Sequence, residues 1–252
     1  MATTFKFDSG PSASWARLFF NAPRQHYITH PSGRFRTEFG PVYYRGRLKS
    51  NTVKVLIVGQ DPSTDEILAQ RNLVGSAGQR AQRLLNKIGI NKSYVAFNTF
   101  LYGIKGQMDG VMNAAAVEPT LLNYRNSLFD KVAGSNGLQA IISFGNGADL
   151  AIANWNSRPA GVPWFQLTHP SAPDNIVLPS WNARLIDLHN AIQPDSGAVV
   201  NTTPYGAAFG PNDVADIPRE DFSFGLVEWH GTGGTTRSQR NGDNIINWTS
   251  PL

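Results

Sequence analysis

Four short, mostly apolar runs, rich in Val and Ile, stand out along the first two thirds of the chain. The runs are Val53–Val58, Tyr94–Phe97, Ala140–Phe144 and Trp164–Leu167. Such runs are typical of strands that other elements cover on both faces, whereas half-exposed strands alternate apolar and polar residues. The pattern therefore predicts a buried central sheet of four parallel strands.

Segments with helical periodicity separate these runs. In Ala77–Ile88 the apolar residues recur at spacings of three and four, which places them on one face of a helix. Ser76 can cap the start of this helix, and Gly89 can end it. Three further helices are expected at Pro119–Val132, Asp149–Trp155 and Trp181–Ile192. Alternating strands and helices predict a three-layer α/β/α sandwich, with helices on both faces of the four-stranded sheet.

The regular pattern covers residues 1–192, which we expect to form one domain with a basic N-terminal segment. Residues 193–252 are rich in Gly, Pro and Asn, so we expect an irregular extension that packs on the domain. No apolar run approaches the roughly 18 residues that cross a bilayer, and the first residues lack the layout of a secretory signal. The sequence thus predicts a cytoplasmic monomer with no membrane partner.

The sequence contains no cysteine, which excludes disulfides, thiolate metal sites, cysteine nucleophiles and cysteine-ligated iron–sulfur clusters. His26 and His30 are spaced to share a helix face, but Pro31 and the surrounding aromatic residues argue against a metal site there. A dinucleotide-binding loop, a P-loop and a nucleophile elbow are also missing. We therefore expect neither a metal nor a cofactor.

The net charge of +4 is unevenly distributed along the 252 residues. Residues 1–50 hold 8 basic and 2 acidic residues, whereas residues 192–252 hold 3 basic and 7 acidic ones. Basic and aromatic residues are interleaved in the first segment: Arg34, Phe35, Arg36, Phe39, Tyr43, Tyr44, Arg45, Arg47 and Lys49. Cations beside flat rings suit a nucleic-acid strand, whose phosphates bind the charges while its bases stack. The alternative is a solvated basic face beside core aromatic residues.

Polar residues follow each predicted strand at the point where the strand ends. They include Gln60 and Asp61 after the first strand, Asn98 after the second, and His169 after the fourth; Gly-Asn-Gly (145–147) follows the third. Ligands of parallel sheets bind outside the carboxyl ends of the strands, so these side chains are expected to share one crevice. Each residue alone has an ordinary explanation, since Asp before Pro is a common turn and a lone His usually satisfies a local hydrogen bond.

At these positions the chain resembles the uracil-DNA glycosylase superfamily. The resemblance lies in the segments VLIVGQDPS, AFNTFLYGI, IISFGNGA and LTHPSAP, which occur in the expected order. The segment NLVGSAGQRAQRLL also resembles the stretch that follows the first motif in the iron–sulfur branch of the superfamily, although the cluster cysteines are missing. The resemblance covers about residues 53–188 and implies the glycosylase fold.

The resemblance also implies a role for each polar residue. Asp61 would orient the attacking water and stabilise the cationic sugar, and His169 would donate a hydrogen bond to uracil O2. Asn98 would pair with uracil O4 and N3–H and so reject cytosine. Backbone N–H groups near Gln60 would surround the leaving base, and Ser171 would hold a DNA phosphate.

Three positions depart from the family pattern. Ser63 stands where the family places a tyrosine that blocks the thymine methyl group, and Leu73 or Val74 stands where a phenylalanine usually stacks on uracil. The wedge that fills the gap left by the flipped base would fall on Pro173 or within Ile176–Leu178. Three aromatic residues are candidates for the missing stacking ring: Phe97, Phe100 and Tyr102.

The sequence therefore predicts a monofunctional DNA glycosylase of base excision repair. It would flip uracil out of DNA and hydrolyse the N-glycosidic bond, leaving an abasic site. One alternative is a non-catalytic or covalently trapping uracil-DNA binding protein on the same fold. Another is an unrelated α/β hydrolase or nucleotide-binding protein.

Overall fold

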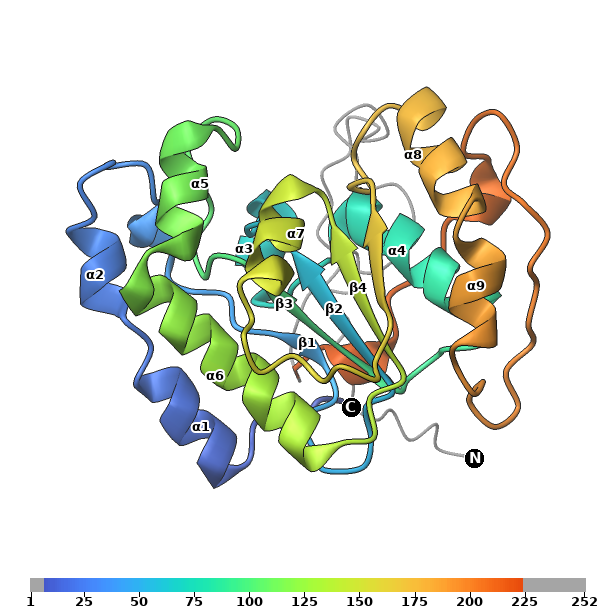
Figure 1. The fold of residues 1–252 in the computed structure, drawn as a ribbon, viewed down its shortest axis with the longest axis horizontal. Helices are drawn as coiled ribbons and strands as arrows, with labels where there is room; N and C mark the ends of the chain where they lie inside the picture. The colour runs from blue at the N-terminus through green and yellow to red at the C-terminus, as the bar shows by residue number, and fades with distance from the viewer. Residues whose placement is uncertain (1–6, 224–252) are drawn as a thin grey trace, which may run out of the picture.

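A computed structural model describes residues 7–223 of the chain, with a five-stranded mixed sheet at its centre (Figure 1). The strands lie in the order β1-β3-β2-β4-β5. Their bounds are β1 Arg45–Gly46, β2 Val55–Gly59, β3 Tyr94–Asn98, β4 Ala140–Phe144 and β5 Trp164–Leu167. The four expected strands are present and parallel to one another, but β1 adds an antiparallel edge to β3. The prediction of a wholly parallel four-stranded sheet was thus wrong. The sequence did not predict β1 because a two-residue strand leaves no apolar run.

Helices cover both faces of this sheet. Alternate residues of each strand point to opposite faces, so that Val55 and Ile57 join one core cluster while Leu56 and Val58 join the other. The first cluster includes residues of α4, α8 and α9, and the second includes residues of α1, α6 and α7. The helix bounds are α1 Ala13–Phe20, α2 Arg24–Ile28, α3 Thr64–Ala69, α4 Gly75–Lys87, α5 Gly110–Val117, α6 Pro119–Ser135, α7 Asn146–Ala153, α8 Asp174–Asn182 and α9 Leu185–Asn190.

The predicted helices correspond to α4, α6 and α7, with small shifts at their ends. The helix α4 begins after Val74, so Ser76 lies inside its first turn and is not the cap. Gly89, with φ of +84°, follows its last turn as expected. The predicted helix Trp181–Ile192 was wrong, because two helices meet there and the chain turns between Asn182 and Leu185. The apolar period continues across this break, since both helices pack on the same face of the sheet.

The described part of the extension, residues 193–223, lies against the domain. Asp195 accepts hydrogen bonds from the backbone N–H groups of residues 91–93, at 2.9–3.1 Å. Asp221 is completely buried and contacts Arg45 and Arg47, with an Arg47 Nη1 to Asp221 Oδ1 distance of 2.9 Å. The remaining residues of the predicted extension, 224–252, lie outside the described part of the chain.

These contacts correct the interpretation of the basic N-terminal segment. Arg45 is 0% exposed, Arg47 binds Asp221, and Arg34 forms an ion pair with Asp109. Three of the basic residues that suggested a nucleic-acid surface are therefore committed to partners within the fold. Within residues 7–223, no helix combines the length and the apolar character that crossing a membrane requires.

Candidate active site at the carboxyl ends of the parallel strands

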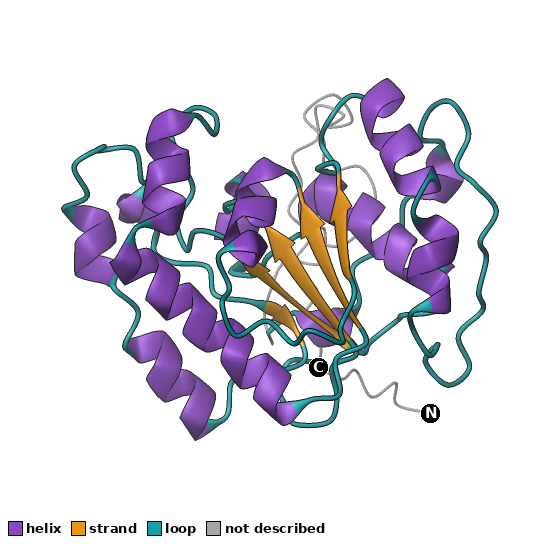
Figure 2. Cartoon of the chain, in the orientation of Figure 1, coloured by secondary structure: helices purple, strands orange, loops and turns teal. Residues whose placement is uncertain are grey.

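The parallel strands all end at one edge of the sheet, where their arrowheads meet the loops (Figure 2). Gly59, the last residue of β2, pairs with Asn98, the last residue of β3. The hydrogen bonds continue beyond the ladder, because the N–H of Thr99 donates to Gly59 O at 2.9 Å and the N–H of Phe100 to Gln60 O at 3.0 Å. The loops that follow β2 and β3 are thus held together just outside the sheet.

Asn98 is buried at this edge, and its carboxamide has a fixed orientation. Its Nδ2 donates to Oε1 of Glu66, a buried residue of α3, at 3.2 Å. Its Oδ1 faces Gly59, where an added Cβ would lie only 2.3 Å away. Glycine is therefore required at position 59 to leave room for the amide. Because Nδ2 carries two hydrogens, one of them remains for a ligand.

Glu66 is the residue of this site that the sequence analysis missed. Its carboxylate accepts from the backbone N–H groups of Ser63 and Leu73, at 2.8 and 2.7 Å, as well as from Asn98. Burial raises the pKa of Glu66, and these hydrogen bonds oppose that shift. The spacing of Ser63 and Glu66 is that of a capping box, which is a recognisable sequence signal for the start of α3. The contact with Asn98, 32 positions away, has no such signal.

Leu73 lies beside Asn98 in a strained conformation. Its φ of +51° falls in the left-handed region, which is uncommon for a residue with a branched side chain. Glu66 accepts from its N–H, and Arg45 Nη1 donates to its carbonyl oxygen at 2.7 Å. The same carbonyl leaves no space for a side chain at position 78, where a Cβ would lie 1.8 Å away. Its side chain reaches within 3.7 Å of a Cβ placed on Gly59, so it borders the space around the Asn98 amide.

Asp61 follows β2 on the same edge, with both of its oxygens engaged. Oδ2 accepts from the N–H of Ile104 at 2.9 Å, and Oδ1 accepts from the side-chain amide of Gln60 at 3.0 Å. Burial raises the pKa of Asp61, while these two donors and the nearby Arg36 favour its charged form. A carboxylate has about four acceptor sites, so Asp61 retains capacity for a water molecule.

His169 is held as a neutral imidazole with a defined tautomer. The backbone N–H of Ser171 donates to Nδ1 at 3.2 Å, and Ser171 Oγ lies 2.7 Å from the same atom. Because an amide N–H can only donate, Nδ1 is an acceptor, and the proton of the neutral ring is on Nε2. Burial lowers the pKa of His169 to about 4. At neutral pH this side chain therefore presents an uncharged N–H donor.

The turn between β4 and α7 connects these residues. Gly145, with φ of +83°, packs so closely on His169 that a Cβ would lie 3.2 Å from His169 Cβ. A Cβ on Gly147 would lie 3.0 Å from Cγ of Gln60, whose amide donates to Asp61. Asp61, Asn98 and His169 thus follow or end strands of the same edge, with Gly145 packed on His169 and Gly147 packed on Gln60.

The remaining predicted residues lie around this edge. Ser63 is exposed and precedes α3, where its N–H is capped by Glu66. Ser171 and Pro173 are exposed in the loop between β5 and α8, the loop in which Arg80 Nη1 donates to Pro170 O at 2.8 Å. Ser171 is thus available to a phosphate, but it also positions the imidazole of His169.

Several candidates are ruled out by burial. Phe97 packs between Trp15 and Phe129 in the core on the sheet face covered by α1, α6 and α7. The prediction of Phe97 as a stacking ring was therefore wrong. Phe100 is 0% exposed, and Tyr102 is 3% exposed, so neither presents a ring face at the strand-end edge. Of the wedge candidates, Val177 and Leu178 are core residues, whereas Ile176 is 53% exposed. Pro173 and Ile176 therefore remain as wedge candidates, and Leu73, which borders the space around the Asn98 amide, is 3% exposed.

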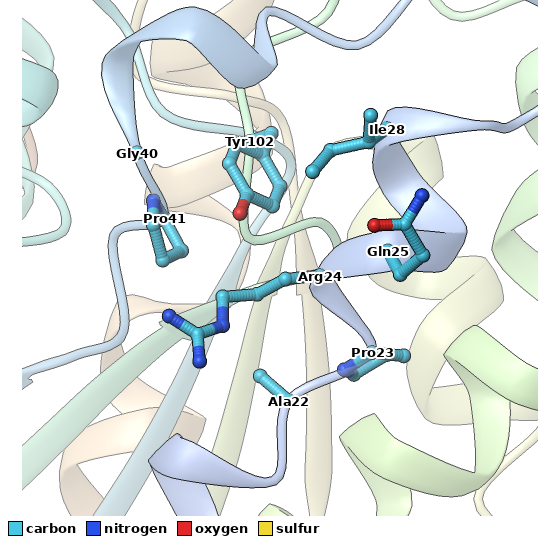
Figure 3. Close-up of a pocket in the computed structure, with 8 residues that line it drawn as sticks. All are labelled: Ala22, Pro23, Arg24, Gln25, Ile28, Gly40, Pro41 and Tyr102. Carbon is cyan, nitrogen blue, oxygen red and sulfur yellow. The ribbon is translucent and has the colours of Figure 1, made fainter.

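A separate hollow lies between the N-terminal segment and the loop that follows β3 (Figure 3). The side chain of Arg24 and the hydroxyl group of Tyr102 point toward it. Its other lining residues are Ala22, Pro23, Gln25, Ile28, Gly40 and Pro41. Of the predicted site residues, only the stacking candidate Tyr102 lines this hollow, and Asp61, Asn98 and His169 do not, so the hollow is distinct from the strand-end site.

The chain matches no protein-family model and no curated protein. The functional argument therefore depends on the chemistry of the strand-end site. That site combines a half-buried carboxylate, an amide with a fixed orientation and a neutral imidazole N–H. Together these groups can read a hydrogen-bonding edge, position a water and stabilise a developing negative charge.

Proposed function

We propose that this protein is a monofunctional uracil-DNA glycosylase that hydrolyses the N-glycosidic bond of a flipped-out uracil. The proposal rests on the position of Asp61, Asn98 and His169 at the carboxyl ends of strands along one edge of the sheet. It also rests on the neutral state of His169, with its proton on Nε2. Cleavage of this bond creates a cationic sugar and a uracil anion. The three groups have the charges and hydrogen-bonding capacities that these two species require.

His169 is proposed to stabilise the leaving uracil. Negative charge develops on uracil O2 as the bond breaks, and a fixed N–H donor aimed at such charge can lower a barrier by about 3–4 kcal/mol. A neutral donor suits this role because its pKa of about 4 keeps it uncharged, and its geometry set, before the reaction begins. The contact with Ser171 fixes the tautomer that this role needs.

Asn98 is proposed to select the base. Its free N–H would donate to uracil O4, and Oδ1 would accept from uracil N3–H. Cytosine reverses this pattern, since it offers a donor at position 4 and an acceptor at N3. The hydrogen bond to Glu66 supports the selection because it opposes rotation of the amide, which would accommodate cytosine.

Asp61 is proposed to hold the attacking water and to stabilise the sugar cation. The donors from Ile104 and Gln60 fix the carboxylate in place while leaving lone pairs for the water. An amine nucleophile is not required, and Lys54 lies before β2, bound to the carbonyl oxygens of Gln193 and Pro194 at 2.8 and 3.0 Å. The reaction is therefore proposed to be simple hydrolysis that leaves an abasic site.

Uracil-containing DNA is the proposed substrate, and Leu73, which is 3% exposed, borders the space around the Asn98 amide that would receive the edge of the flipped base. A left-handed leucine held by Glu66 and Arg45 is the kind of strained residue that is found at ligand sites. Ser63 is too short to fill the space of a thymine methyl group as a tyrosine would. We therefore expect exclusion of thymine to be weaker than exclusion of cytosine.

The test is incubation of the protein with oligonucleotides that contain one uracil, either single-stranded or paired with G or A. Alkali then reveals any abasic site, and free uracil is measured by chromatography. We expect repeated turnover by the wild type and at least about a 10²-fold lower rate for Asp61→Asn, as for other lost acid–base groups, with DNA binding retained.

Asp187→Asn is the matched control, because Asp187 is an exposed carboxylate on α9. It should excise uracil at the wild-type rate. Binding of uracil DNA without release of uracil would support the non-catalytic alternative and contradict the proposal. Wild-type excision by Asp61→Asn would remove Asp61 from the mechanism.

A further inference from the structure

Three potential metal ligands meet where α2 approaches the start of α6 (Figure 1). One donor atom from each of His26, His30 and Glu118 lies within 4.8 Å of the other two. His26 belongs to α2, His30 follows the C-cap of that helix, and Glu118 is the N-cap of α6. The three residues thus join segments of the chain that are about ninety positions apart.

The donor atoms that face each other lack other partners. Nε2 of His26 and Oε2 of Glu118 are 2.7 Å apart, yet neither has a hydrogen-bond partner of acceptable geometry among the described residues, and both atoms are buried. Their side chains are 33% and 29% exposed, so an ion can enter from the solvent. His26 Nε2 and Glu118 Oε2 thus face each other at ion-pair distance without a well-aligned hydrogen bond, and a second imidazole lies beside them.

The surroundings orient these donors. His30 Nδ1 lies 2.8 Å from Ser32 Oγ and 3.2 Å from the backbone N of Ser32. Nε2 is free to bind an ion in the tautomer whose Nδ1–H donates to Ser32 Oγ, so metal binding would place the ring proton on Nδ1 and replace the contact with the Ser32 N–H. Oε1 of Glu118 accepts from the N–H of Thr120 at 3.4 Å, so its Oε2 is turned toward His26. Outer hydrogen bonds of this kind orient metal-binding side chains in known sites.

We propose that His26, His30 and Glu118 bind a divalent transition-metal ion, and that Zn²⁺ is the ion they fit. Zinc commonly takes two imidazoles and one glutamate, with water at a fourth, open position. Bonds of about 2.0–2.1 Å in tetrahedral geometry separate the ligand atoms by roughly 3.3 Å, which small side-chain rotations would reach here. The sequence argued against this site because of Pro31 and the surrounding aromatic residues, but Glu118, about ninety positions away, supplies a third ligand.

The ion would connect the N-terminal segment to the rest of the fold. The ring of His30 packs edge-on against Phe35 at 5.1 Å, and Phe35 forms an isolated bridge with Ile104. The N–H of Ile104 holds Asp61. Zinc at this place would therefore stabilise the layer behind the strand-end site, whether or not the protein is a glycosylase.

The test uses the full-length chain, stripped with a chelator, incubated with a slight excess of Zn²⁺ and gel-filtered. Mass spectrometry of the eluted protein should find a single Zn²⁺ per chain. Zn²⁺ at about a hundredfold above its Kd should raise Tm by about 5 °C or more. Co²⁺ in place of Zn²⁺ should give the visible absorption of a site with fewer than six ligands.

The variants His30→Gln and Glu118→Gln should bind Zn²⁺ at least about tenfold more weakly, since even outer partners of a metal site contribute that much. Glutamine at position 118 keeps an oxygen for the N–H of Thr120, so α6 should remain folded, and circular dichroism checks this. His189→Gln, which changes a half-buried histidine of α9, should bind like the wild type. A wild type without bound Zn²⁺, or variants that retain it fully, would overturn the proposal.

Discussion

Glu66 determines how the carboxamide of Asn98 is turned. Its Oε1 accepts from Asn98 Nδ2 at 3.2 Å and from the N–H of Leu73 at 2.7 Å, so the NH2 group of the carboxamide, not Oδ1, faces it. The amide proposed to read the base is therefore oriented by a second residue, which is not proposed to touch the substrate. Glu66 is a positioning residue in the proposed mechanism.

We expect Glu66→Gln to reduce discrimination between uracil and cytosine by about tenfold. The two carboxylate oxygens of Glu66 accept from three N–H groups, whereas glutamine has only one acceptor oxygen. The side-chain NH2 group of this glutamine would therefore face at least one of these donors and leave it without an acceptor. The loss should also lower the free energy of unfolding by about 1–3 kcal/mol. The measurement is kcat/KM for uracil and for cytosine in the same oligonucleotide.

A double-mutant cycle separates positioning from general damage. In an Asn98→Ala background, Glu66→Gln should change the ratio of the two kcat/KM values little further, because the amide it orients is gone. Additive effects on the ratio would show that Glu66 acts independently of Asn98.

Asn98→Asp would bring a second carboxyl group beside Glu66, and one of the pair would have to hold a proton.

His169 makes a prediction about pH and stability. Burial lowers its folded-state pKa from 6.5 to about 4. Between these values the unfolded chain binds a proton that the folded chain does not, so this residue makes stability fall as the pH falls from about 6.5 to 4. Chemical denaturation of His169→Asn should therefore show a shallower loss of stability over this range than the wild type.

The same comparison above pH 7 provides its control. There His169 is neutral in both states, so the difference in unfolding free energy between the two proteins should not depend on pH. Asparagine can still accept from the N–H of Ser171 through Oδ1. Parallel stability curves down to pH 4 would contradict the shifted pKa.

At the scale of elements, the helix α8 would present the proposed wedge. Pro173 is its N-cap, and Ile176 is 53% exposed in its first turn, beyond the loop that carries His169. An exposed apolar side chain at this position can enter a base stack from which a nucleotide has been flipped. Ile176→Ala should therefore slow excision from duplex DNA by about tenfold and leave excision from single-stranded DNA nearly unchanged.

Ile186→Ala is the matched control, because Ile186 is 58% exposed on α9. It should leave the ratio of duplex to single-strand rates as in the wild type. An equal loss on both substrates for Ile176→Ala would mean that the residue supports the fold and is not a wedge.

The sequence predicted the elements whose signal is local. The runs that form β2 to β5 are mostly apolar, and Pro119 and Gly89 mark helix ends by their own backbone preferences. What the sequence could not show depends on partners far along the chain. The strand β1 exists through its pairing with β3, and the break between α8 and α9 leaves the apolar period intact.

The candidate site follows the same rule. The positions of Asp61, Asn98 and His169 at strand ends could be predicted because parallel strands end together. Their supports could not be predicted, since the Glu66 contact and the His26–Glu118 pair join residues 32 and about ninety positions apart. The charge pattern of residues 1–50 gave one wrong prediction. The interleaved cations suggested an exposed surface for nucleic acid, whereas Arg45 and Arg47 contact the buried carboxylate of Asp221.

At the scale of the whole molecule, the extension supports the site from behind. Asp221 lies against Arg45, and Arg45 in turn donates to the carbonyl oxygen of Leu73 at 2.7 Å and packs on the ring of Tyr94. Tyr94 also donates to Asp221. The carboxylate of Asp221 thus neutralises Arg45, and Arg45 holds the strained Leu73 beside the proposed base pocket.

We expect Asp221→Asn to lower the free energy of unfolding by about 3–5 kcal/mol. Asparagine has nearly the same shape, but it leaves the guanidinium of Arg45, which is 0% exposed, without a compensating charge. Urea denaturation followed by circular dichroism measures the change, with Glu220→Gln as the control on an exposed neighbouring acid. Because Arg45 also holds Leu73, kcat/KM for uracil should fall in Asp221→Asn and remain unchanged in Glu220→Gln. A stability loss within about 0.5 kcal/mol of the control would mean that the extension contributes little to the fold.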